Sequence, residues 1–159
     1  MPAMPDTDLH NPPPGLTRRL AAMLYDTLLV IPLAGLSVAL ILLLVARLAG
    51  ATEDDDLVLQ AHWVQLICAL CVIGFYTAFW SKGGQTLGMQ AWRIQVLDAS
   101  GSPPGAARCV LRCLAAVISL LPAGLGYWWV LIDRERRSWH DRLSGTHLVL
   151  LPKSSRNKR

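Results

Sequence analysis

The feature that most constrains this chain is an apolar run over residues 20–46, in which Asp26 is the one acidic or basic side chain. A run of more than about 18 apolar residues is long enough to cross a lipid bilayer as a helix. A carboxylate inside such a helix costs roughly 2.5–3.5 kcal/mol on insertion scales. The run therefore predicts a membrane-spanning helix with one charged residue, Asp26, that neighbouring groups must stabilise.

Arg19 stands immediately before this run and is the nearest candidate partner for Asp26. The two positions are seven residues apart, so in a helix both side chains leave the same face, with a rise of about 10 Å between them. A long arginine side chain can shorten that distance by extending along the helix. Two interpretations remain open: Asp26 reaches toward the membrane interface, or it forms a buried polar point that faces other helices.

A second apolar run covers residues 61–80, with Trp63 and Trp80 near its two ends, where interfacial aromatic residues are common. Between Leu48 and Ser81 the chain has no Lys or Arg. Because positive residues concentrate in cytoplasmic loops, this distribution places the loop between the two runs outside the cytoplasm. The same distribution of positive residues places both termini in the cytoplasm. We expect the acidic cluster 53–56 to be a solvated loop.

A third apolar run, residues 113–132, is interrupted by Pro122, Gly124 and Gly126. It is too short for two full spans of about 20 residues each. A single crossing would place outside the cytoplasm a C-terminal region with eight positive residues, against the usual distribution: Arg134, Arg136, Arg137, Arg142, Lys153, Arg156, Lys158 and Arg159. We therefore predict a broken helical run, either a hairpin or short spans, that enters and leaves on the cytoplasmic side.

Two short segments, residues 92–97 and 146–151, are rich in strand-forming residues and bounded by turns. They predict a small cytoplasmic two-stranded β element. The predicted fold class is an all-α multi-pass membrane protein, with two full transmembrane helices, the broken third run and this β element. Residues 1–15 form a Pro-rich leader that we expect to be disordered. Residues 16–152 form the membrane domain, and residues 153–159 form a basic tail.

The net charge of +4 does not indicate nucleic acid as a partner, because the positive residues flank the apolar runs. Arg108 and Arg112 are four residues apart, and we expect both to contact anionic lipid at the membrane surface. The chain has no nucleotide-binding, hydrolase or metalloprotease motif, so we expect neither an enzyme nor a cofactor. We interpret the four cysteines as small apolar side chains rather than metal ligands: Cys68, Cys71, Cys109 and Cys113.

Four segments occur in a characteristic order along the chain. They are R-L-A-A-x-x-x-D from Arg19 to Asp26, G-G-Q-T-L-G-M before the first strand, L-R at the start of a helix, and W-H-D-R-L-S-G-T near the end. This order resembles the RDD family of bacterial membrane proteins over roughly residues 15–152. The family is named after one arginine and two aspartates. Arg19 and Asp26 match the first two, and Asp141 is our choice for the third, with Asp133 as the alternative.

The resemblance implies a multi-pass membrane protein of mostly unknown molecular function, in a family some of whose members are suspected transporters, including cation/proton exchangers. Our first hypothesis is a protein of the bacterial inner membrane that transports ions or small solutes through a site at Arg19 and Asp26. The alternative is a non-transporting assembly or interaction protein in which these charges are structural. Two or three membrane elements cannot enclose a transport path alone. We therefore expect, besides the lipid bilayer, a homo-oligomer or a larger membrane complex. A hydrated cavity at Asp26 would favour transport, whereas a dry site would favour a structural role.

We further expect Arg19, Asp26 and Asp141 to converge at the cytoplasmic side of the helices as one charge-paired site. An arginine has five donors in a planar fork and can bridge two carboxylates. On this arrangement, removing Arg19 would leave two unpaired carboxylates. It should therefore destabilise the protein more than replacing both aspartates together.

Overall fold

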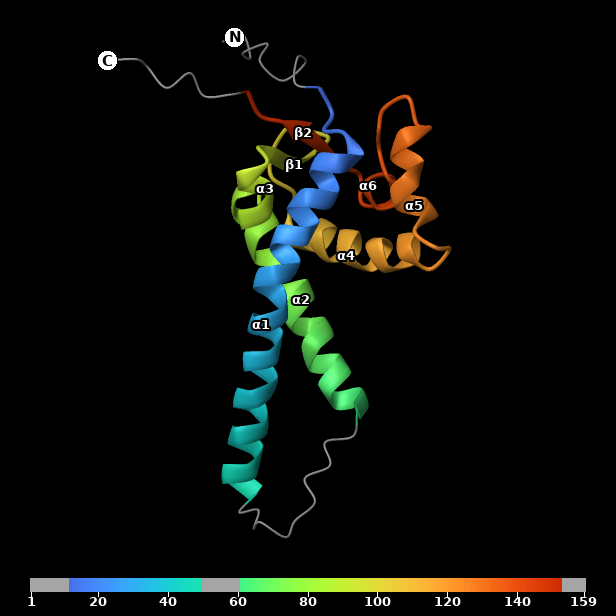
Figure 1. Ribbon diagram of the computed structural model, residues 1–159. Helices are drawn as coiled ribbons and strands as arrows, with labels where there is room; N and C mark the ends of the chain where they lie inside the picture. Colours follow the sequence, from blue (N-terminus) through green and yellow to red (C-terminus); the bar gives the residue numbers. More distant parts are fainter. Residues whose placement is uncertain (1–11, 50–60, 153–159) are drawn as a thin grey trace, which may run out of the picture. The chain divides into compact units, whose positions relative to one another are not determined.

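The computed structural model describes residues 12–49 and 61–152, which form six α-helices, one 3-10 turn and a two-stranded sheet (Figure 1). The predicted leader up to residue 11, the acidic cluster 53–56 and the basic tail 153–159 lie outside the described residues. The elements in chain order are α1 (Leu16–Ala49), α2 (Ala61–Gly83), α3 (Leu87–Ala91), β1 (Ile94–Asp98), α4 (Ala106–Leu120), α5 (Leu125–Trp128), η1 (Trp129–Leu131), α6 (Trp139–Leu143) and β2 (Thr146–Leu150).

The two predicted membrane-spanning helices are confirmed as α1 and α2, which contain apolar stretches at Leu16–Val45 and Trp63–Gly83. With 34 residues, α1 is about 51 Å long, which exceeds the roughly 30 Å of a bilayer's hydrocarbon core. The helix continues through Pro32 without interruption. The chain divides into two compact units, and the boundary between them falls within α1 and within α2.

The unit Thr27–Phe75 contains the larger parts of these two helices. Most of its apolar side chains are exposed, including Leu28 at 67 % and Leu36 at 58 %. The Ser37 hydroxyl donates to the Leu33 carbonyl at 2.8 Å, and its oxygen lies 3.4 Å from Cys71 Sγ. A pair of helices with so much outward apolar surface suits a lipid environment, because lipid tails solvate that surface and the helices satisfy their own backbone groups.

The other unit combines residues 12–26 with residues 76–152 and contains the sheet. Strands β1 and β2 pair antiparallel, from Ile94 opposite Leu150 to Asp98 opposite Thr146. The predicted pairing of these two segments is therefore confirmed. One small apolar core holds this unit together: Ala22, Trp80, Met89, Ile94, Val96, Cys109 and Leu148. Because these residues come from α1, α2, α3, both strands and α4, the core joins segments that lie far apart in the sequence.

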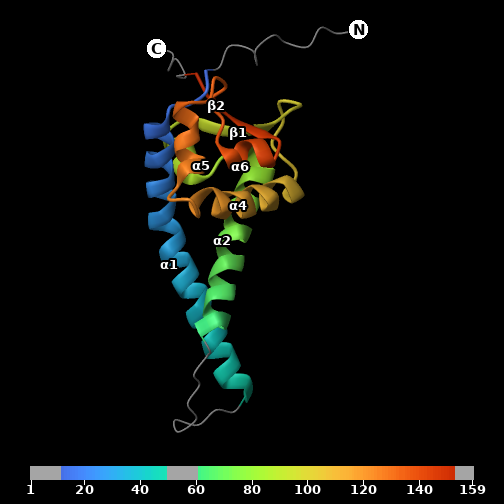
Figure 2. The same cartoon turned by 90° about the vertical axis from the view of Figure 1, so that its right-hand side faces the viewer.

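The third apolar run is broken, as predicted. Helix α4 ends at Leu120, and the chain turns by 107° before α5 and η1. Gly124 adopts a left-handed conformation at the turn, with φ of 75°, which favours glycine. Gly126 packs against α4 so closely that a Cβ there would lie 2.5 Å from the Ser119 Cβ. Figures 1 and 2 both show α4 directed transverse to the first turns of α1 rather than alongside them.

Candidate functional site

Three charged side chains meet in the interior of the unit that contains the sheet. Arg19 donates from Nη1 to Asp141 Oδ2 at 2.8 Å, and Arg112 Nη2 lies 2.5 Å from Asp141 Oδ1. All three residues are buried, with exposed fractions of 7 % for Arg19, 3 % for Arg112 and 0 % for Asp141. We call these three residues the Asp141 cluster. One carboxylate is thus held by two guanidinium groups.

Arg19 lies near the start of α1, where its remaining donors bind backbone oxygens. Its Nε donates to the Pro14 carbonyl at 3.1 Å, and its Nη2 donates to the Arg136 carbonyl at 2.7 Å. The side chain therefore joins the chain before α1 to the segment before α6. Charge-assisted hydrogen bonds of this kind are stronger than neutral ones.

Asp141 lies in the first turn of α6 and completes a capping box with Ser138. The Ser138 backbone N–H donates to Asp141 Oδ2 at 2.9 Å, and the Ser138 hydroxyl accepts from the Asp141 N–H at 3.4 Å. This arrangement satisfies amide groups at the helix start and fixes the carboxylate in place. The same side chain therefore both begins α6 and binds the two arginines.

Arg112 lies on α4 and connects it to β2 and α2. Its Nη1 donates to the Thr146 hydroxyl at 2.5 Å, and its guanidinium carbon lies 5.2 Å from the centre of the Trp80 ring. Arginine over an aromatic face is attracted by the ring's quadrupole. Our expectation that Arg112 contacts anionic lipid at the membrane surface is wrong, because its side chain is buried and bound within the protein. Arg108 remains half exposed and pairs with Asp98 at 3.3 Å.

The charges around Asp141 fix two protonation states. Burial by itself raises the pKa of Asp141, but the attraction of Arg112 and Arg19 outweighs burial and holds that pKa well below its usual range. Neighbouring His140 is affected in the opposite sense, since burial and then the charge of Arg112 lower its pKa to about 3. At neutral pH, therefore, Asp141 is ionised and His140 is neutral, with its Nε2 2.8 Å from the Ser138 hydroxyl.

Asp26 is buried in a different polar environment. Its Oδ2 accepts from the Thr86 hydroxyl at 2.5 Å and its Oδ1 accepts from the Gly88 N–H at 2.8 Å. Thr86 is the N-cap of α3, so Asp26 binds the start of that helix to α1. Gly88 approaches α1 so closely that a Cβ there would lie 2.3 Å from the Ala22 carbonyl oxygen.

The prediction of one site at which Arg19 bridges two carboxylates is therefore wrong in part. The structure brings Arg19 and Asp141 together, while Asp26 is bound by neutral donors from α3. The reason is geometric: the Arg19 guanidinium is directed toward Pro14, Arg136 and Asp141. The prediction that removing Arg19 destabilises the protein more than replacing both aspartates assumed that Arg19 is the shared partner of Asp26 and Asp141. The structure removes that assumption.

Asp133, the alternative family aspartate, lies outside the Asp141 cluster. It pairs with Arg142, whose side chain is 49 % exposed, and accepts from the Arg137 N–H at 2.8 Å. Of the two candidates, Asp141 is the one that contacts Arg19.

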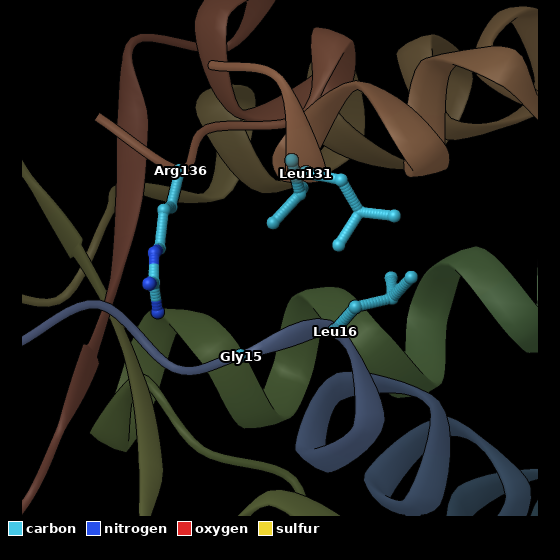
Figure 3. Close-up of a pocket in the computed structure, with 5 residues that line it drawn as sticks. Gly15, Leu16, Leu131 and Arg136 are labelled. Atoms are coloured by element: carbon cyan, nitrogen blue, oxygen red, sulfur yellow. The ribbon is translucent and has the colours of Figure 1, made fainter. Parts of the chain in front are cut away.

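A small pocket of about 170 Å³ lies beside the start of α1, lined by Gly15, Leu16, Val130, Leu131 and Arg136 (Figure 3). Ligand pockets for small molecules measure about 300–1,000 Å³, so this one is small for an organic solute. Neither Asp26 nor any residue of the Asp141 cluster lines it. Within residues 12–49 and 61–152, no group of three or more His, Cys, Asp or Glu side chains is placed to hold a metal ion.

Comparison with known families gives a match over most of the chain. The model of the RDD family matches residues 13–145, which include Arg19, Asp26, Asp133 and Asp141. The chain belongs to the RDD family. Comparisons with curated proteins and with solved structures give no match. As an RDD protein with two helices long and apolar enough to cross a bilayer, it is a membrane protein.

Sequence reasoning missed the second arginine of this RDD protein, although a signal was present. Cys109, Arg112, Ala115 and Ser119 follow a helical period, and all four are buried. A stripe that places small and polar residues on one side of an apolar helix indicates that this side faces the protein interior. By contrast, no local pattern around Thr86 or Gly88 indicates that these residues bind Asp26.

Proposed function

We propose that this protein is a non-transporting membrane assembly or interaction module, and that its buried charges are structural. One observation carries the proposal: both oxygens of Asp141 are held by guanidinium groups, and the whole Asp141 cluster is buried. A solute-binding residue needs a free coordination position facing a cavity. The contacts of Asp141 instead join α1, α4 and α6 to one another.

The energetics of buried ions support this reading. Removing one partner from a buried ion pair typically destabilises a protein by about 3–5 kcal/mol, because an uncompensated charge remains inside. Such a cluster favours one arrangement of the segments that contribute to it. Here those segments are the start of α1, the middle of α4 and the first turn of α6.

The exposed apolar surface of α1 and α2 supports an interaction role. In the unit Thr27–Phe75, side chains such as Leu40 and Leu70 are 56 % and 60 % exposed, and apolar surface of this kind contacts lipid or other helices in a membrane. We therefore propose that the protein works as a homo-oligomer or within a larger membrane complex, and that it is neither an enzyme nor a nucleic-acid-binding protein.

We place it in the bacterial inner membrane with both termini in the cytoplasm. The positive residues near the start of α1 and between η1 and β2 support this orientation, since such residues favour the cytoplasmic side: Arg18, Arg19, Arg134, Arg136, Arg137 and Arg142. A reporter enzyme fused after Arg159 should be active in its cytoplasmic form and inactive in its periplasmic form. The opposite result would contradict the orientation.

Transport remains the second candidate because of Asp26. This carboxylate is 2 % exposed, lies in an apolar spanning helix, and receives its two hydrogen bonds from the neutral donors Thr86 and Gly88. Intramembrane carboxylates commonly mark ion or proton paths. A route past Asp26 would need walls supplied by other copies or partners.

Flux measurements in proteoliposomes separate the two functions. The wild-type protein, Asp26→Asn and the matched control Asp98→Asn, which changes a carboxylate at the end of β1 outside the apolar helices, would be compared with protein-free vesicles under sodium, potassium and proton gradients. We expect all four preparations to give the same flux. A cation or proton flux present in wild type and in Asp98→Asn but lost in Asp26→Asn would overturn the structural proposal and support transport.

A further inference from the structure

Helix α4 has the reverse of the polarity that a surface helix of a water-soluble protein shows. Its buried side carries Arg112 and Ser119 with the small residues Cys109 and Ala115. Its exposed side, continued by the C-cap residue, carries a stripe of large apolar residues at helical spacing, between 46 % and 78 % exposed: Leu111, Leu114, Ile118 and Leu121. We call these four residues the α4 apolar face. In water such a face would be unfavourable, because each large apolar side chain loses roughly 1.5–3 kcal/mol when it is left exposed.

The α4 apolar face continues beyond the turn into α5 and η1. Leu125, Trp128 and Leu131 are 56 %, 54 % and 63 % exposed. The chain bends by 107° between the two helical parts, so they do not form one straight segment. α4 itself has 15 residues, or about 22 Å, which is less than the hydrocarbon core of about 30 Å.

We propose that the α4 apolar face lies in the boundary between lipid headgroups and acyl chains, with α4 parallel to the bilayer plane instead of crossing it. The occupant of this face is therefore lipid of the leaflet at the N-terminal end of α1. Helices of this kind bury an apolar face about 5–10 Å into that boundary and keep their polar face on the other side.

The orientation of α4 within its own unit supports lipid as the occupant. Figures 1 and 2 show α4 directed transverse to the first turns of α1, which begin the spanning helix. A helix that is transverse to the start of a spanning helix runs along the membrane surface. The same turns of α1 expose Leu20 and Leu24, at 45 % and 66 %, so apolar surface suited to lipid is already present in this unit.

The residues that flank the α4 apolar face match the chemistry of a lipid surface. Arg108 precedes it on the first turn of α4, and Arg134 and Arg136 follow η1, all three exposed. Trp128 and Trp129 lie between them, and tryptophan is enriched at the headgroup level of membranes. Exposed arginines beside an apolar helix are attracted to anionic headgroups, each by about 1 kcal/mol.

Depth measurements on the full-length protein test this proposal. Single cysteines at positions 111, 114, 118 and 121, in a chain whose four native cysteines are changed to alanine, would carry an environment-sensitive fluorophore. The protein would be reconstituted in phosphatidylcholine–phosphatidylglycerol vesicles with bromine atoms at defined acyl-chain depths. Position 40, in the spanning part of α1, provides the deep control, and position 100, in an exposed turn, provides the aqueous control.

We expect the four α4 positions to share one shallow depth, about 5–10 Å below the headgroup boundary. A crossing helix would instead change depth by about 15 Å between positions 111 and 121, and that result would overturn the proposal. Absence of quenching at all four positions, with position 40 quenched, would also overturn it, since protein would then cover the face.

A photocrosslinking amino acid at position 118 gives a second measurement in the chain with its native cysteines, in case the cysteine-free variant does not fold. Mass spectrometry should identify adducts of position 118 with phospholipid. Crosslinked dimers of the chain, without lipid adducts, would show that a second copy occupies the face and would contradict the proposal.

Discussion

Asp141 and Asp26 are both carboxylates buried in the unit that contains the sheet, with exposed fractions of 0 % and 2 %, yet their surroundings differ in kind. Asp141 is held between two arginines and accepts one backbone N–H. Asp26 is bound by a threonine hydroxyl and a glycine N–H. The first environment supplies opposite charge, and the second supplies only dipoles.

Because of this difference, we expect replacement by asparagine to destabilise the protein more at Asp141 than at Asp26. An amide in place of Asp141 would leave two buried guanidinium groups without a counter-ion. An amide in place of Asp26 would keep nearly the same shape and could still accept from Gly88. A hydrogen bond from a neutral donor to a carboxylate contributes about 1.5–3 kcal/mol, of which an amide oxygen keeps a part, whereas breaking a buried ion pair costs about 3–5 kcal/mol.

The largest expected effect is therefore that of Asp141→Asn. We expect it to lower the free energy of unfolding by about 3–5 kcal/mol, because Arg19 and Arg112 lose their shared carboxylate. Thermal or denaturant unfolding in a mild detergent would measure the change. Asp133→Asn is the matched control and should have a much smaller effect, since its arginine partner is half exposed. Equal effects of the two variants would show that the buried Asp141 cluster contributes no more to stability than the half-exposed ion pair of Asp133 and Arg142.

The two arginines should differ little from each other, because both have partners besides Asp141. Arg112→Ala and Arg19→Ala are each expected to cost about 3 kcal/mol, since Arg112 also binds Thr146 and covers Trp80, and Arg19 also donates to two backbone carbonyls. Arg112→Lys should recover little, since a lysine lacks the planar fork. In a double-mutant cycle, Arg112→Ala combined with Asp141→Ala should cost less than the sum of the two changes. Simple additivity would show that the two side chains do not act as one cluster.

The pH dependence of stability should report on His140, which faces Arg112, Arg19 and Asp141. An unfolded histidine binds a proton near pH 6.5, whereas folded His140, with a pKa of about 3, stays neutral until far lower pH. The unfolded state therefore binds more protons in this window, and the free energy of unfolding falls as pH decreases from about 6.5, by up to about 1.4 kcal/mol per pH unit.

His140→Gln should flatten this slope between about pH 6.5 and pH 5. Asp141 contributes in the same direction but at lower pH, because its pKa is lowered in the folded state and its contribution is lost only below about pH 4. Unfolding curves at several pH values would separate the two windows. An unchanged slope in His140→Gln would show that His140 does not remain neutral in the folded protein.

Asp26→Asn should have the smallest effect of these changes, about 1 kcal/mol, because both of its donors are neutral. The measurement is the same unfolding experiment in detergent. A loss as large as that of Asp141→Asn would indicate that Asp26 compensates a buried positive charge, and would remove the distinction drawn here between the two carboxylates.

Much of this architecture could be predicted from the sequence. Long apolar runs predict spanning helices because a helix satisfies all the backbone hydrogen bonds of a single segment in lipid, and Pro122 with Gly124 predicts the break between α4 and α5. The strand pair followed from β-rich segments between turns. The pairing of Arg19 with Asp141 was expected from the need of each charge for a partner.

The sequence could not show which residues each charged side chain binds. Arg19 is two helical turns from Asp26 in sequence, yet its guanidinium is directed toward residues more than 100 positions away. Helix α3 is five residues long and lacks a strong periodic pattern, so its approach to α1 through Gly88 leaves no local signature. Such contacts depend on tertiary packing, which a local pattern does not encode.

The contact between Arg19 and Asp141 also sets an order for the biosynthesis of the protein. The two residues are 122 positions apart. At about 5–20 residues per second, a ribosome needs roughly 6–24 s to add the residues between them. Throughout that interval the first helix has its arginine in place while the matching carboxylate does not yet exist. The nascent chain must therefore be kept with this arginine in water, among headgroups or on an insertion factor, and the unit that contains the sheet can close only after almost the whole family domain has been translated.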